Sequence, residues 1–181
     1  MRQPITSDSL KVFMKALAAA ATTASRIYLV GGATAVLLGW RTSTIDIDLK
    51  IVPESDELLK SLPDLKELLH LNIELASPGD FIPELPGWQE RSRFIQQEGK
   101  LAFYHYDFYA QALAKIERGH QIDSQDVQQL IVRGLVDRQR LREFFFMIED
   151  QLYLYPSLDR SAFRRSVERV TGTHSDSVDE S

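Results

Sequence analysis

The sequence contains no cysteine, which excludes disulfide bonds, thiolate zinc sites and a cysteine nucleophile. It also lacks the run of about 18 apolar residues that a membrane-spanning helix needs, and its first ten residues lack the apolar stretch of a secretory signal. We therefore expect a soluble, cytoplasmic protein without a membrane partner. Any metal ion must be bound by oxygen or imidazole ligands, which favours a hard cation such as Mg²⁺ or Mn²⁺.

A surplus of positive charge is also missing. The 21 Lys and Arg residues are outnumbered by 26 Asp and Glu residues, for a formal net charge of -5. Proteins that coat nucleic acid by neutralising its phosphates normally carry a basic surplus, so that class is disfavoured. Arginines gather in residues 133–142 and 160–169, but acidic side chains are interleaved with them, as is typical of solvated helix faces.

The apolar periodicity predicts an α+β fold. Residues 10–23 and 33–38 have helical spacing, and residues 27–30 form a short apolar strand that ends at Gly31-Gly32. Residues 43–52 alternate with a period of two and give the clearest strand. The same reasoning predicts a helix over residues 56–70 that is broken at Pro63, and further strands over residues 71–76 and 101–106. Residues 77–87 are expected to form a loop.

From residue 107 onward the pattern is helical, with segments expected at residues 108–118, 124–133, 138–152 and 160–170. We therefore predict an α/β core over residues 1–106 and a helical C-terminal unit over residues 107–170. The core is expected to be a small mixed sheet flanked by helices. The polar residues 171–181 are expected to form a disordered tail.

Two acidic residues and two glycines are the candidates for chemistry. Asp46 and Asp48 stand two apart on the alternating strand, so their carboxylates share a face while Ile45 and its apolar neighbours point into the core. Bare carboxylates repel each other, and a divalent cation reverses that penalty, although many solvent-facing strands alternate in the same way. Gly31-Gly32 lies at a strand–helix junction, where backbone N–H groups can approach a phosphate.

The order VGG then IDIDL, with thirteen residues between Gly32 and Asp46, resembles the signature of the minimal nucleotidyltransferases of the polymerase-beta-like superfamily. The segment WRTSTIDIDLKI is similar to the form found in its toxin-like branch, which includes AbiEii-type and DUF6036-like proteins. The resemblance covers residues 30–76 and continues more loosely over residues 108–131. It implies transfer of a nucleoside monophosphate from a nucleoside triphosphate to an acceptor, with pyrophosphate leaving.

The same resemblance implies roles for individual residues. Asp46 and Asp48 would be the catalytic, metal-binding pair, and a third carboxylate on a later strand would be Glu74, with Asp80 as the competitor. The Gly31-Gly32 turn would face the phosphates. The further nucleotide-binding candidates are residues that match the family pattern: Arg41, Thr44 and Lys115.

The acceptor cannot be identified from the sequence, and protein hydroxyls, tRNA ends and small molecules are all candidates. If the chain is a toxin, as the resemblance allows, an antitoxin protein is its expected partner. The main alternative is a nucleotidyltransferase-like domain without turnover that binds nucleotide or a protein partner. A glycosyltransferase with an acidic pair normally needs a longer chain, and a dinucleotide-binding unit would need a third glycine after Gly32.

Several other polar residues are interpreted structurally. Asp123 and Asp126 are read as a helix N-cap and its partner in the first turn. The histidines lack metal-ligand spacing and are assigned no role: His70, His105, His120 and His174. An aromatic group is expected in the core or in a cleft wall: Tyr104, Tyr106, Phe108 and Tyr109.

Overall fold

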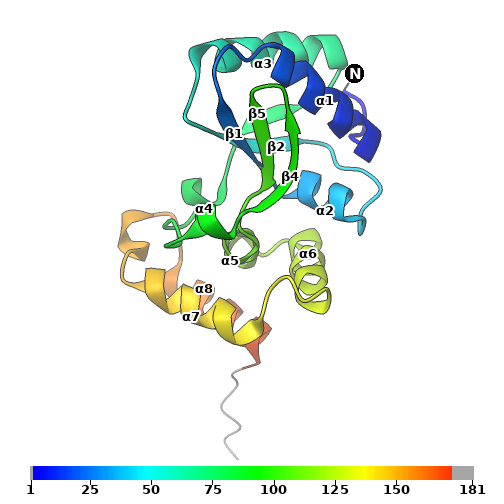
Figure 1. Cartoon of the computed structure of the whole chain (residues 1–181). Coiled ribbons are helices and arrows are strands. Elements are labelled where there is room, and N and C mark those ends of the chain that lie inside the picture. The colour runs from blue at the N-terminus through cyan, green and yellow to red at the C-terminus, as the bar shows by residue number, and fades with distance from the viewer. Residues whose placement is uncertain (1, 173–181) are drawn as a thin grey trace, which may run out of the picture. The chain divides into compact units, whose positions relative to one another are not determined.

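The computed structural model describes residues 2–172 and divides the chain into two compact units (Figure 1). The first unit comprises Met1–Asp80 and Gly87–Asp107, and the second comprises Phe81–Pro86 and Phe108–Ser181. Of the predicted disordered tail, Thr171 is the last residue of a helix and Gly172 is its C-cap. Residues 173–181 lie outside the described residues.

The first unit is built on a five-stranded mixed sheet in the order β3-β2-β1-β5-β4. Strand β1 is antiparallel to β2 and parallel to β5, β2 is parallel to β3, and β4 and β5 form an antiparallel hairpin. The sheet confirms the predicted α+β class with a small mixed sheet flanked by helices. The strands are β1 (Ser25–Val30), β2 (Ile47–Val52), β3 (Ile73–Leu75), β4 (Arg93–Glu98) and β5 (Leu101–His105).

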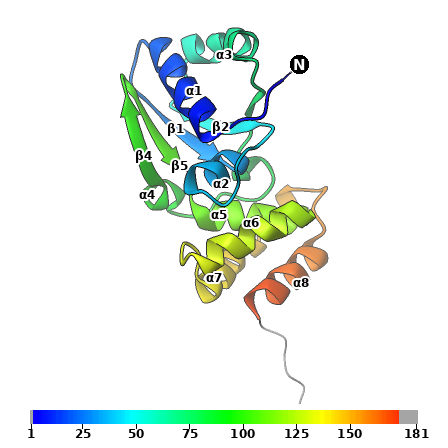
Figure 2. The ribbon, with the colours of Figure 1, turned by 90° about the vertical axis from the view of Figure 1, so that its right-hand side faces the viewer.

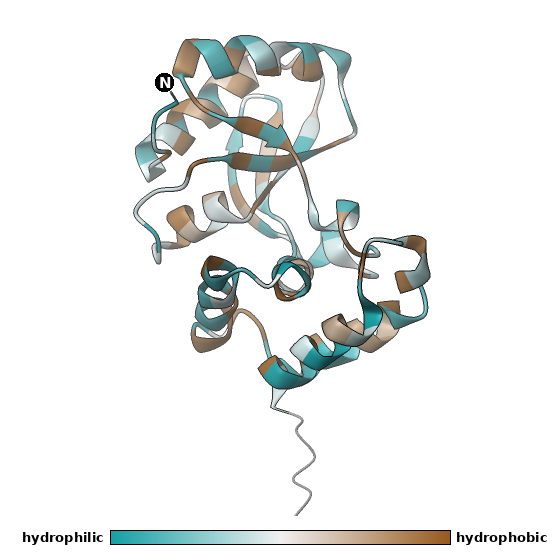
Figure 3. Ribbon diagram, turned by 180° about the vertical axis from the view of Figure 1, so that it is seen from behind, coloured by the Kyte–Doolittle hydropathy of each residue, from teal (hydrophilic) through white to brown (hydrophobic). Residues whose placement is uncertain are grey.

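One face of this sheet is buried against helices. The helices of the unit are α1 (Ser7–Ala19), α2 (Gly32–Leu38), α3 (Asp56–Leu69) and the short α4 (Trp88–Arg91), with a 3-10 turn η1 (Pro78–Asp80). Helices α1 and α3 lie side by side in both Figure 1 and Figure 2. Apolar and polar residues alternate along β2 (Figure 3). The buried apolar residues of β1, β2 and β5 join those of α1 and α3 in one core, which includes Leu10, Phe13, Leu17, Ile27, Leu29, Leu49, Ile51, Leu62 and Phe103.

The predicted strand over residues 43–52 begins later than expected. Pairing with β3 starts only at Ile47, and pairing with β1 starts only at Asp48, because Thr44 pairs instead with Ile5 in an isolated bridge. Ile45 therefore does not point into the core but is 76% exposed, and Asp46 precedes the strand. The alternation of apolar and polar residues in the sequence therefore extends beyond the residues that pair in the sheet.

Pro63 does not break its helix, contrary to the prediction. Helix α3 runs through it because Leu58, Leu62 and Leu65 remain buried on one side. Pro63 has no N–H for the carbonyl of Leu59, but Leu59 is only partly buried, so water can reach that carbonyl. Burial of the apolar side outweighs the lost hydrogen bond.

The sheet face opposite the core carries an aromatic cluster, which includes two members of the predicted aromatic group, Tyr104 and Tyr106. Tyr28 is fully buried between Trp88, at a ring distance of 4.8 Å, and Tyr104, at 5.3 Å. Trp88 in turn stacks on Tyr106 at 4.3 Å with an interplanar angle of 5°. Offset and edge-on aromatic contacts of this kind add to the area they bury, so α4 is fastened over this part of the sheet.

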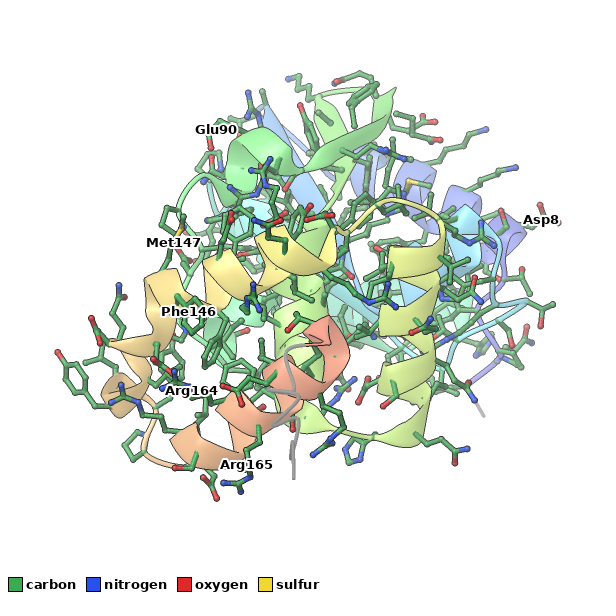
Figure 4. All side chains as sticks on the ribbon, turned by 90° about the horizontal axis from the view of Figure 1, so that it is seen from below. Asp8, Glu90, Phe146, Met147, Arg164 and Arg165 are labelled. Atoms are coloured by element: carbon green, nitrogen blue, oxygen red, sulfur yellow. The ribbon has the colours of Figure 1, made fainter. Side chains whose placement is uncertain are left out.

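The second unit contains four helices: α5 (Phe108–Arg118), α6 (Gln121–Val132), α7 (Arg138–Glu149) and α8 (Arg160–Thr171), with a 3-10 turn η2 (Leu152–Leu154). Phe145 of α7 meets Phe163 of α8 edge-on at 5.0 Å in its interior. On the surface, Arg164 lies 5.8 Å from the ring of the half-exposed Phe146 (Figure 4). Arg164 also pairs with Glu149 and Glu168 at 3.6 and 3.3 Å, which fits the predicted solvated helix faces.

No helix in residues 2–172 combines the length and the apolar character that crossing a membrane requires.

A buried histidine joins α2 to the sheet of the first unit. Nδ1 of His105, the last residue of β5, lies 3.0 Å from the Thr34 hydroxyl of α2, and both residues are almost fully buried. Burial, together with the smaller effect of the positive charge of Arg93, its partner across the hairpin, lowers the pKa of His105 from its ordinary 6.5 to about 4. His105 is therefore neutral in the folded protein at neutral pH.

This pKa predicts a loss of stability in acid. Between pH 6.5 and 4 the unfolded chain binds more protons at His105 than the folded chain, so the free energy of unfolding falls as the pH falls. Urea unfolding at pH 7.5 and pH 5 should show that the native chain loses about 2 kcal/mol more than His105→Asn, which cannot titrate. Equal losses in the two proteins would contradict a neutral buried His105.

Candidate functional site

The parallel pairing of β2 with β3 brings two predicted site residues together. Asp48 is the direct partner of Glu74 in this pairing, and Val30, at the end of β1, is the partner of Asp48 on its other side. Paired residues of neighbouring strands share a face and lie about 5 Å apart. The carboxylates of Asp48 and Glu74 are thus neighbours on the sheet face opposite the main core.

Asp46 joins this pair through a residue that the sequence analysis did not single out. The amide nitrogen of Asn72 donates a hydrogen bond to Oδ1 of Asp46 and a second one, of 3.0 Å, to Oε1 of Glu74. The backbone carbonyl of Asn72 accepts from the N–H of Ile47 at 2.8 Å. The spacing of Asn72 and Glu74 by two residues on a strand was the signal that could have identified Asn72.

The glycine turn lies at the same edge. Gly31 has φ of +64°, a conformation that side chains disfavour, and serves as the N-cap of α2. A Cβ built on Gly31 would lie 3.5 Å from Oδ2 of Asp48, so the turn and this carboxylate are in contact distance. The predicted neighbourhood of the glycine pair and the acidic strand is therefore present in the fold.

Thr44 explains the second glycine. A Cβ on Gly32 would lie 2.0 Å from Oγ1 and 2.6 Å from Cβ of Thr44, closer than any real contact. Thr44 cannot easily move away, because its backbone exchanges two hydrogen bonds with Ile5, of 2.8 and 2.9 Å. Thr44 therefore packs against the glycine turn, and its predicted role in nucleotide binding stays a prediction.

Two further candidates occupy structural positions in the first unit. The backbone N–H of Arg41 donates to the carbonyl of Ala35 at 3.3 Å, just after α2 ends. Oδ2 of Asp80 accepts from the backbone N–H of Ser77 at 2.9 Å and thereby caps the η1 turn. Glu74 rather than Asp80 is thus the strand neighbour of Asp48.

The oxygen chemistry of the carboxylate group suits a hard cation. Asp46, Asp48 and Glu74 would offer only carboxylate oxygens, which Mg²⁺ and Mn²⁺ prefer. Within residues 2–172, however, no three His, Cys, Asp or Glu side chains converge into a ready-made metal cluster. Binding a cation here would require the side chains around Asn72 to adjust.

Lys115, the fifth predicted nucleotide-binding residue, belongs to the second unit and is buried there. Its ammonium lies 2.8 Å from Oδ2 of Asp126 and 3.6 Å from Oδ1 of Asp123. Asp123 also accepts two hydrogen bonds from Arg118, of 2.8 and 2.5 Å. The predicted contact of Lys115 with a triphosphate stays a prediction.

The interpretation of Asp123 and Asp126 as an N-cap and its partner is wrong. The N-cap of α6 is His120, and both carboxylates are buried as acceptors for the cations of α5. Burial alone would raise the pKa of Asp123, but the hydrogen bond and charge of Arg118 and the charge of Lys115 lower that pKa on balance. Asp123 does lie in the first turn of α6, but both carboxylates face inward.

The contact of Thr44 with Gly32 predicts the effect of a single methyl group. We expect Gly32→Ala to lower the free energy of unfolding by about 1–3 kcal/mol, because the new Cβ would overlap the Thr44 side chain. Chemical unfolding of the native chain and the variant measures this difference.

The matched control repeats the change without the obstacle. In a Thr44→Gly background the three atoms nearest to the new methyl, Oγ1, Cβ and Cγ2 of Thr44, are gone, so Gly32→Ala should cost much less there. The same cost in both backgrounds would show that the clash is not what demands a glycine at position 32.

Comparison with known proteins identifies the family of the chain. The model of a family described as "Nucleotidyltransferase of unknown function (DUF6036)" matches residues 9–171. No match to the chain was found among curated proteins or among solved structures. Because the family match spans most of the 181 residues, the chain belongs to this family of nucleotidyltransferases of unknown function.

Proposed function

We propose that the protein transfers a nucleoside monophosphate from a nucleoside triphosphate to an acceptor, using a divalent cation, Mg²⁺ or Mn²⁺, at Asp46, Asp48 and Glu74. The observation that carries this proposal is the pairing of Asp48 with Glu74 beside the Gly31 turn. Family membership supplies the reaction class, and the side chains at this edge supply the acidic groups that such a reaction needs.

The position of each residue suggests its proposed role. The Gly31-Gly32 turn would face the phosphates, as the resemblance implies. Asp46 and Asp48 would hold the cation against the triphosphate, and Glu74 would complete the site on the acceptor side. The cation would supply positive charge to the attacking and leaving oxygens. The acceptor hydroxyl loses its proton and forms a bond to the α-phosphorus, and the bond from that phosphorus to pyrophosphate breaks.

The acceptor and the partner are proposed on the resemblance to the toxin-like branch. A protein hydroxyl or a tRNA end is the acceptor class it implies, and a separately encoded antitoxin is the partner. Arg41 is the remaining cation of the first unit that matches the family pattern and would face a phosphate.

A binding function without turnover is the second candidate, and one observation favours it. Asp46 and Glu74 are both engaged by the Asn72 amide, and no ready-made cluster of metal ligands exists among residues 2–172. A chain of this kind would bind nucleotide but transfer nothing. Binding alone is therefore the first property to measure.

Thermal unfolding with each ribonucleoside triphosphate and Mg²⁺ or Mn²⁺ tests the site. A ligand at 100 times its dissociation constant adds about 2.7 kcal/mol, which should raise the melting temperature of a chain of this size by several degrees. We expect this rise for the native chain with one or more triphosphates, only in the presence of the cation.

The variant and its control separate the site from general charge. Asp46→Asn with Asp48→Asn should abolish the rise, whereas Asp8→Asn with Asp64→Asn, which removes two exposed helix carboxylates, should retain it. A native chain that no triphosphate stabilises, or a double variant at positions 46 and 48 that responds like the native chain, would count against the proposal.

A further inference from the structure

Asn72 occupies the position between two carboxylates of the proposed site. Its single amide nitrogen donates to Oδ1 of Asp46 and, at 3.0 Å, to Oε1 of Glu74. A side-chain amide has two N–H bonds that diverge from one nitrogen, so it can serve two acceptors at once. The two carboxylates are thereby tied to a common point.

The backbone position of Asn72 is fixed by the sheet. The carbonyl of Asn72 accepts from the N–H of Ile47 at 2.8 Å, so Asn72 lies at the start of the β2–β3 pairing. Asp46 immediately precedes β2 and has no strand pairing to hold it. Among the described residues, the Asn72 amide is therefore the tie that connects Asp46 to the paired carboxylates.

A hydrogen bond that only stabilises the fold would not need to join two carboxylates. Neighbouring carboxylates repel each other, and the positive end of an amide dipole between them offsets part of that repulsion. A divalent cation offsets it far more strongly. The amide and the cation therefore satisfy the same two carboxylates, one weakly and one strongly.

We infer that Asn72 is a positioning residue of the nucleotidyl-transfer site, which holds Asp46 and Glu74 toward each other through one oxygen of each carboxylate, so that their other oxygens can bind a divalent cation. This inference rests on the proposed function, because it assigns the cation to the same carboxylates. Groups that orient metal ligands typically change metal affinity about 10–100-fold when they are removed.

The sequence offers a direct probe, because Asn72 is its only asparagine. The full chain labelled with ¹⁵N in the asparagine side chain should give a single pair of amide signals in a proton–nitrogen NMR spectrum. We expect both proton signals to move upfield as Mg²⁺ is added, alone and then with each ribonucleoside triphosphate, since their hydrogen bonds to carboxylates lengthen. The shift should saturate at the cation concentration that saturates thermal stabilisation.

Two substitutions separate positioning from mere structure. Asn72→Ala removes the donors and should weaken Mn²⁺ binding, measured by calorimetry, about tenfold or more. Asn72→Asp replaces the donors with a third negative charge, so without cation it should melt below Asn72→Ala, and at saturating Mg²⁺ that order should reverse. A purely structural role would lower the melting temperature of Asn72→Ala but leave its affinity for Mn²⁺ unchanged.

The outcomes distinguish this inference from the function beneath it. If the native chain binds the cation and triphosphate but the Asn72 signals stay fixed and Asn72→Ala binds Mn²⁺ as tightly, the inference is overturned and the proposed function stands. If the native chain binds no cation with or without triphosphate, both are overturned. Shifted signals together with weakened Mn²⁺ binding support the assignment.

Discussion

The parallel pairing of β2 with β3 is the constraint on which the candidate site depends. It places Glu74 directly beside Asp48, while the antiparallel pairing of β1 with β2 brings the end of β1, and with it Gly31, to the same place. Neither contact follows from distance along the chain, since helix α3 separates the two acidic strands. A shift of the β3 register by one residue would turn Glu74 to the opposite face.

The glycine turn is held in place from two sides. Thr44 fills the space above Gly32 and is itself tied to Ile5, while Thr34 of the following helix contacts the buried His105 of β5. Helix α2 is short, with only seven residues, so these contacts rather than its own hydrogen bonds fix its start. The same turn then approaches the Asp48 carboxylate.

Much of this fold follows from periodicity. The strand that ends at Gly31, the helix that ends at Gly39 and the helix α5 were all predicted, because burial imposes strict spacing on them. Strand β4 was not predicted: it lies at the edge of the sheet, and Phe94 and most of its neighbours are exposed or half-buried, so no apolar alternation marks it. The two-residue turn at Gly99 was its available signal.

The site was predictable only as far as its residues carry local patterns. Asp46, Asp48 and the glycine pair could be found from spacing, but Ile45 shows that strand alternation does not reveal where pairing begins. The spacing of Asn72 from Glu74 places the two on one face, but only the pairing of β3 with β2 brings Asn72 to Asp46. The ion pairs of Lys115 with Asp126 likewise depend on how α5 packs against α6, which helix-start patterns do not report.

The most direct test of the central claim follows the phosphate that is transferred. The native chain is incubated with Mn²⁺, total tRNA and cell protein, and with a nucleoside triphosphate labelled with ³²P at either the α- or the γ-phosphate. Transfer of a nucleoside monophosphate predicts that label from the α-position enters tRNA or protein, label from the γ-position does not, and Asp48→Asn transfers neither. Incorporation of the γ-label, or equal α-labelling by Asp48→Asn, would contradict a nucleotidyl-transfer site at this edge of the sheet.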